Sequence, residues 1–107
     1  MSKSTLKITV SHPAGLHARP ASLFVQTANK FNSNIQVQNL TDDSDLVNAK
    51  SILSILTLGV CQDHEIEISA EGDDAEDALK ALEALIEDNF GEEWASNLYN
   101  ISKNIRK

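Results

Sequence analysis

The sequence has few of the residues that mark secreted, membrane and nucleic-acid-binding proteins. Its single cysteine, Cys61, cannot form an internal disulfide and has no second cysteine nearby for metal binding. No apolar run of about 18 residues is present, and the opening MSKSTLKITV lacks the apolar stretch of a signal peptide. Aromatic residues make up only 5% of the chain, with no basic stripe among them. We therefore expect a cytoplasmic protein that binds neither membrane nor nucleic acid.

Acidic residues are absent from one part of the chain and concentrated in another. Residues 1–41 hold four basic side chains and no acidic one, whereas residues 42–93 carry all 16 acidic residues against two lysines. The last 14 residues add three basic side chains, and the net charge is −7. This asymmetry suits an N-terminal part that meets an acidic partner, although four basic residues also fit an ordinary solvated surface.

Hydrophobic spacing predicts one domain of alternating strands and helices. The chain has 107 residues, 41% of them hydrophobic, which fits a single core. The predicted elements are strand 5–10, a helix with its apolar stripe over 21–31, strand 34–39, strand 46–49, helix 51–58, strand 64–70 and helix 74–88. The strands are apolar on one face only, so this β-α-β-β-α-β-α order predicts an α+β fold. Its antiparallel sheet would have one wet face and all helices on the other.

Three residues are predicted to set helix ends. Asp73 is predicted to cap the last helix, with Glu76 as its capping-box partner three residues later. Gly59 is predicted to stop the helix that precedes it, although periodicity alone leaves this apolar stretch ambiguous between strand and helix.

A C-terminal tail is expected beyond a domain of residues 1–91. Within residues 92–107, apolar side chains follow a helical stripe, which predicts a short amphipathic helix: Trp94, Leu98, Ile101 and Ile105. The sequence leaves open whether this tail docks on its own domain, joins two subunits or begins a linker.

The stretch AGLHARPAS, residues 14–22, places a histidine where a helix is predicted to begin. Pro20 falls in the first turn, where its missing N–H costs nothing, so His17 is at or next to the N-cap. The first-turn amides, at Ala18 and Arg19, and the helix dipole form a site suited to an anion, above all phosphate. The Arg19 side chain adds a permanent cation.

This setting suits a histidine that carries a phosphoryl group. Positive surroundings disfavour protonation, so we expect His17 to be largely neutral and nucleophilic near pH 7. The same positive field would stabilise the phosphorylated product. A metal site fits worse, because His12 and His64 offer no ligand spacing, and no hydrolase motif such as G-x-S-x-G occurs. A histidine that only caps a helix is the alternative, but the company of Gly15 and Arg19 favours the phosphoryl role.

Three stretches together resemble HPr, the histidine-containing phosphocarrier family of the bacterial phosphoenolpyruvate-dependent sugar phosphotransferase system. GLHARPA resembles its active-site motif, NAKSILSILTLGV its second signature, and ISAEGDDAEDALKALEALI its final strand and helix. The resemblance covers about residues 4–91 in order. It implies an open-faced β-sandwich, with a four-stranded antiparallel sheet and three helices on one face.

The resemblance also implies roles for two residues and a set of partners. His17 would accept a phosphoryl group at Nδ1 from enzyme I and pass it to sugar-specific IIA domains, and Arg19 would contact that group. The protein would be a monomeric phosphoryl carrier rather than an independent catalyst, and we expect no cofactor and no metal.

The second signature is apolar nearly all the way round its predicted helix, which a small domain cannot bury completely. We expect an exposed apolar patch of Leu53 with Ile52 and Leu56, the alternative being that Leu53 is buried. By resemblance this patch, with Pro20, docks enzyme I and IIA domains.

Ser51 supports an alternative function for the same domain. A serine at a helix start is most often an N-cap, but by resemblance it matches the serine that HPr kinase/phosphorylase modifies in some bacteria. The chain could then be a regulatory HPr-like protein that binds a carbon-control regulator, or an HPr domain of a fructose-specific phosphocarrier. Retention of His17 and Arg19 favours the working carrier.

Overall fold

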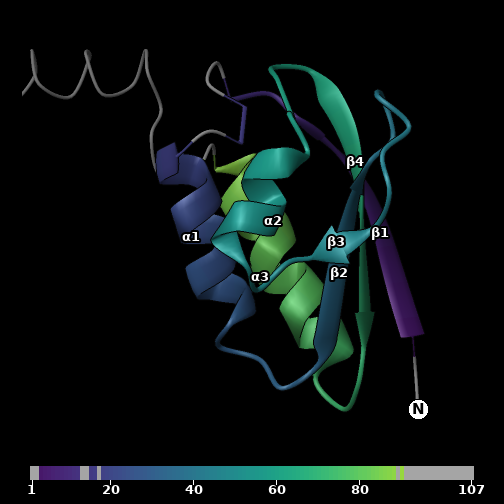
Figure 1. The fold of residues 1–107 in the computed structure, drawn as a ribbon. Coiled ribbons are helices and arrows are strands. Elements are labelled where there is room, and N and C mark those ends of the chain that lie inside the picture. The colour runs from purple at the N-terminus through teal and green to yellow at the C-terminus, as the bar shows by residue number, and fades with distance from the viewer. Residues whose placement is uncertain (1–2, 13–14, 17, 89, 91–107) are drawn as a thin grey trace, which may run out of the picture.

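The computed structural model describes residues 3–12, 15–16, 18–88 and 90, in the predicted β-α-β-β-α-β-α order. The elements are β1 Lys3–Val10, α1 Ala18–Ala28, β2 Asn34–Asn39, β3 Val47–Asn48, α2 Ile52–Thr57, β4 His64–Glu71 and α3 Ala75–Glu87. The strands pair antiparallel in the order β1-β4-β2-β3, and the helices lie together on one face of the sheet (Figure 1). The predicted open-faced α+β fold is confirmed.

The alternating strand patterns place apolar side chains between the sheet and the helices, as predicted. Ile35 and Val37 of β2 are buried, whereas Gln36 between them is exposed. The central strand β4 buries three successive inward side chains: Ile66, Ile68 and Ala70. The inward residues of the edge strand β1 are less covered before Val10, because only one neighbouring strand supports them. The helices complete this core with Phe24 of α1, Ile55 of α2, and Ala78, Leu82 and Ile86 of α3.

The ends of α2 follow the predicted signals. Ser51 is its N-cap, in an extended conformation, and its hydroxyl oxygen accepts a hydrogen bond from the Ser54 amide at 3.4 Å. Leu58 closes the helix, and Gly59 follows with a φ of +61°, in the left-handed region that glycine adopts without strain. Helix α1 ends at Ala28, before the apolar Phe31 that was included in its predicted stripe.

The prediction that Asp73 caps α3 in a capping box with Glu76 is wrong. The helix begins at Ala75 with Asp74 as its N-cap residue, and the Asp74 side chain makes no bond to the helix. Its carboxylate instead accepts hydrogen bonds from the Asn32 amide (2.8 Å), the Ser33 amide (2.9 Å) and the Ser33 hydroxyl. Three donors from a distant segment outweigh the local capping contact.

We predict that Asp74→Asn lowers the melting temperature at pH 7 by a few degrees, because an amide cannot accept from all three donors. The Ser33 hydroxyl and the Asn32 amide hold the pKa of Asp74 below its ordinary value of 3.8. Because the folded-state pKa is lowered, the stabilisation is present above the unfolded-state pKa and is lost as the pH falls through the folded one.

Thermal unfolding of wild type and Asp74→Asn should therefore differ equally at pH 7 and pH 5, and by less below about pH 4. Asp73→Asn, which changes an exposed neighbouring carboxylate, is the matched control and should leave the melting temperature nearly unchanged. A difference that stays the same size down to about pH 2 would contradict the assignment.

Candidate functional site

The chain just before α1 is attached to the loop that follows α2. The Leu16 amide donates to the Val60 carbonyl at 3.0 Å, and Leu16 is 3% exposed. Gly15 has a φ of +60°, and a Cβ there would lie 2.2 Å from the Val60 carbonyl oxygen. Only glycine fits this close approach. The contact joins parts of the chain that are far apart in sequence. The sequence did not predict that the 59–61 loop contacts Gly15 and Leu16.

The first turn of α1 is where the sequence predicts an anion site. His17 lies outside the described residues, and α1 begins at the residue after it. Pro20 is the third helical residue, as predicted, and Arg19 is exposed. The turn, all of it among the described residues, contains no acidic side chain. The backbone amides of Ala18 and Arg19 therefore lie at the positive end of a helix without a neighbouring carboxylate in that turn.

Helices α1 and α2 are tied to each other near both ends. Beside the start of α1, Leu16 bonds to Val60 beyond the end of α2. Beside the end of α1, the Lys50 ammonium donates to the Phe31 carbonyl at 2.7 Å, and the Asn29 side chain donates to the Lys50 carbonyl at 3.4 Å. The two helices thus run in opposite directions, and α2 is held next to the segment that contains the predicted phosphoryl acceptor.

The outer surface of α2 carries the predicted apolar patch, which comprises Ile52, Leu53 and Leu56. These side chains are 39%, 74% and 41% exposed, whereas Ile55 on the same helix is fully buried. The expectation that Leu53 is exposed is confirmed. Leu46 is a further exposed apolar side chain, at 42%. The predicted strand over 46–49 did not indicate that this side chain is exposed.

Two other predicted site residues have structural roles. Pro20 is buried, so in this structure it has little surface to offer to a partner, and it lies in the first turn of α1. Ser51 is half-buried and already caps α2 through its hydroxyl. Ser51 lies at the start of α2, beside the end of α1. The length of α2 therefore separates it from the start of α1.

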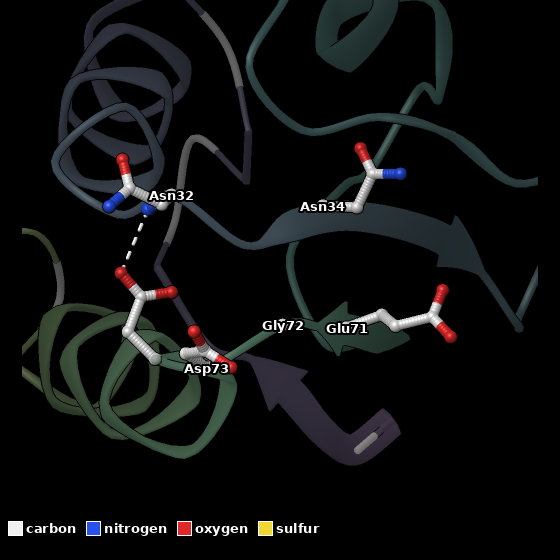
Figure 2. A pocket seen from close by; sticks show the side chains of 6 residues that line it. Asn32, Asn34, Glu71, Gly72 and Asp73 are labelled. Carbon is white, nitrogen blue, oxygen red and sulfur yellow. Dashed lines mark hydrogen bonds between the residues drawn. The ribbon is translucent and has the colours of Figure 1, made fainter. Parts of the chain in front are cut away.

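A hollow of about 400 Å³ lies where β2 begins and β4 ends (Figure 2). This end of the sheet is opposite to the start of α1 (Figure 1). The hollow is lined by Asn32, Asn34, Glu71, Gly72, Asp73 and Asp74. The Asp74 carboxylate is engaged by Asn32 and Ser33. Among the described residues, no group of three or more His, Cys, Asp or Glu side chains is arranged to hold a metal ion. Within the same part of the chain, no helix is long and apolar enough to cross a bilayer.

Comparison of the sequence with known proteins gives matches across most of the described chain. A family model described as PTS HPr component phosphorylation site matches residues 4–88. The phosphocarrier protein HPr of Haloferax volcanii is 52% identical over 79 residues, which cover 74% of this chain and 88% of that protein. The multiphosphoryl transfer protein of Vibrio cholerae is 48% identical over 89 residues, 83% of this chain. The chain spans only 22% of the length of that larger relative.

A solved structure has the same fold. The crystal structure of HPr-C-His from Thermoanaerobacter tengcongensis superposes with a TM-score of 0.79 at 54% sequence identity. The match covers 84% of this chain and 98% of that one.

Proposed function

The chain belongs to the HPr family, the phosphocarriers of the phosphotransferase system, and from this we propose that His17 is the residue that carries the phosphoryl group. In this proposal His17 accepts the group from phosphorylated enzyme I and passes it to sugar-specific IIA domains. The observation that carries the proposal is the acid-free first turn of α1, which begins at the residue after His17.

The chemistry needs a nucleophile and a fixed positive environment. A neutral imidazole nitrogen of His17 attacks the phosphorus, a nitrogen–phosphorus bond forms, and the bond to the donor breaks with its electron pair leaving on the donor. The phosphoryl oxygens then carry charge that the amides of Ala18 and Arg19 and the Arg19 guanidinium can stabilise. Delivery is the reverse: a nucleophile of the acceptor attacks the phosphorus, and the nitrogen–phosphorus bond breaks with its electron pair returning to the imidazole of His17.

The charge around the start of α1 and the apolar patch on α2 favour partners that are acidic and also have apolar surface. The first 41 residues contain no acidic side chain, so the first turn of α1 does not itself repel a negatively charged partner. The apolar patch on α2 lies on a helix tied to α1 and supplies the surface that a transient complex would bury. We therefore place the docking surface at α1 and α2 together.

We predict that Leu53→Asp lowers kcat/KM for phosphoryl acceptance from enzyme I by about tenfold, because a charge replaces the most exposed apolar side chain of the patch. Leu53→Asn separates the loss of apolar contact from the added charge and should have a smaller effect. Gln36→Glu adds a negative charge on the outward side of the sheet and should leave the rate unchanged. An unaltered rate for Leu53→Asp would remove α2 from the docking surface.

A second arrangement is favoured by the match to the Vibrio cholerae protein. This chain matches about a fifth of that larger protein, so an equivalent role is that of an HPr unit within a longer carrier. Transfer between linked units would then occur at a high effective concentration. A regulatory role through Ser51 rests on the resemblance alone, because its hydroxyl already has a capping function.

The direct test is incubation of the protein with phosphoenolpyruvate and enzyme I, followed by intact mass measurement. We expect a gain of one phosphoryl group, and a loss of that group when a IIA domain is added. No gain in mass with an enzyme I that phosphorylates another HPr would contradict the proposal.

A further inference from the structure

A buried asparagine fixes the end of α2 and the loop after it. Asn39 is completely buried, and its Oδ1 accepts from the Thr41 amide (3.1 Å) and the Asp42 amide (3.3 Å). Its Nδ2 donates to the Leu58 carbonyl at 3.1 Å. Backbone amides only donate and backbone carbonyls only accept, so these three contacts determine which side-chain atom is oxygen and which is nitrogen.

Besides the Leu58 carbonyl, Asn39 Nδ2 has two further acceptors within reach, His64 Nδ1 and, at the longer distance of 3.5 Å, Asp42 Oδ2. The distance from Asn39 Nδ2 to His64 Nδ1 is 3.1 Å, and the Cys61 amide donates to the same His64 nitrogen at 3.2 Å. Two donors therefore converge on His64 Nδ1, which can take part in both bonds only as an acceptor. An accepting Nδ1 carries no proton, so the hydrogen-bond network assigns the ring proton to Nε2.

The bond pattern connects His64 to the predicted phosphorylation segment. His64 and Asn39 hold Leu58 and Cys61, the residues on either side of the Gly59–Val60 pair. Val60 in turn accepts from the Leu16 amide, and Leu16 precedes His17 in the chain. A displacement of the 58–61 loop would therefore move the anchor of the segment on the N-terminal side of His17.

We propose that His64 is a positioning residue for phosphoryl transfer, acting through its Nδ1 acceptor on the 58–61 loop and so on Leu16. The functional part rests on the proposed function, whereas the structural part, the tautomer and the anchoring of Leu16, does not. Neither part needs His64 to touch the phosphoryl group.

The first test needs no substitution. Nitrogen-15 NMR of the histidine rings in the full chain distinguishes a protonated from an unprotonated Nδ1. At a pH where the ring is neutral, we expect the His64 proton on Nε2. A proton on Nδ1 would overturn the proposal, because that nitrogen could then accept from neither Asn39 nor Cys61.

The second test compares His64→Leu, which removes the acceptor, with His64→Asn, which restores an acceptor Oδ1 on the same Cγ position. Hydrogen exchange of the Leu16 amide should quicken about tenfold in His64→Leu and return to within about twofold of wild type in His64→Asn. The Ala49 amide, which bonds to the Ile35 carbonyl at 2.9 Å, is the control and should be unchanged. Equal exchange of Leu16 in wild type and His64→Leu would overturn the proposal.

The functional readout is the initial rate of phosphoryl acceptance from enzyme I. We expect His64→Leu to be slower by about fivefold and His64→Asn to recover most of the rate, with one phosphoryl group at the end point in both. A slow rate in both variants would show that a hydrogen-bond acceptor at position 64 does not restore the rate. That result would contradict the positioning role of His64. If the wild type accepts no phosphoryl group, the proposed function fails, while the tautomer and Leu16 exchange still decide the structural part.

Discussion

His17→Ala should accept no phosphoryl group from enzyme I and phosphoenolpyruvate, whereas the wild type should accept one. The substitution removes the only imidazole in the GLHARPA motif, the side chain expected to act as the nucleophile. The group on the wild type should be labile in acid and stable in alkali, as a phosphoramidate is and a phosphoserine is not. Intact mass before and after mild acid treatment measures both properties.

Arg19→Ala should still be phosphorylated, but about tenfold more slowly. The amides of the first turn of α1 remain in this variant, and one charge-assisted contact is lost. Arg19→Lys should recover part of the rate, since it restores the charge without the planar guanidinium. Undiminished labelling of His17→Ala would contradict the assignment of the acceptor, whatever the behaviour of Arg19.

Gly15→Ala should be the most damaging conservative substitution near the site. Its Cβ would lie 2.2 Å from the Val60 carbonyl oxygen and 2.8 Å from Cys61 Cα, both backbone atoms. A φ of +60° adds the ordinary cost of a left-handed alanine, about 1 kcal/mol, and the overlap adds about 1–3 kcal/mol. Because the Leu16–Val60 bond is next to the overlap, phosphoryl acceptance should also fall by more than about tenfold.

Gly59→Ala is the matched control for this prediction. Gly59 has nearly the same φ, +61°, but no atom lies within 4 Å of its added Cβ. It should lose only the backbone term, about 1 kcal/mol, and keep most of its rate. Urea unfolding gives the stability of both variants, and acceptance is then measured where both are folded. Equal losses in the two variants would show that the backbone conformation, rather than the contact with Val60, makes glycine necessary at position 15.

Local patterns in the sequence were sufficient to predict the elements and the faces they bury. Alternation in β2 and β4 and helical spacing in α3 are repeated over several residues, so one unusual residue does not change the prediction. The motif around His17 was likewise recognisable, because its residues are contiguous. The exposure of Leu53 followed from a simple limit, since a helix on one side of a sheet cannot bury its whole surface.

Contacts between distant segments were decided only by the tertiary structure. Asp73 and Asp74 are adjacent carboxylates before α3, and only the proximity of Asn32 and Ser33 determines which one is engaged. The contact of Gly15 with Val60 is invisible in either local stretch. Side-chain hydrogen bonds have no sequence periodicity, so they depend on which segments the packed core brings together.

The same distinction holds for the site itself. The sequence alone determined the residue types available for phosphoryl chemistry, because an imidazole, a guanidinium and a proline at the start of a helix stand within four consecutive positions. The tertiary structure decided what holds that segment in place, the 58–61 loop with Asn39 and His64 behind it. The reason is physical: chemistry at a helix start needs only neighbours in the chain, whereas its anchoring needs partners that folding brings from elsewhere.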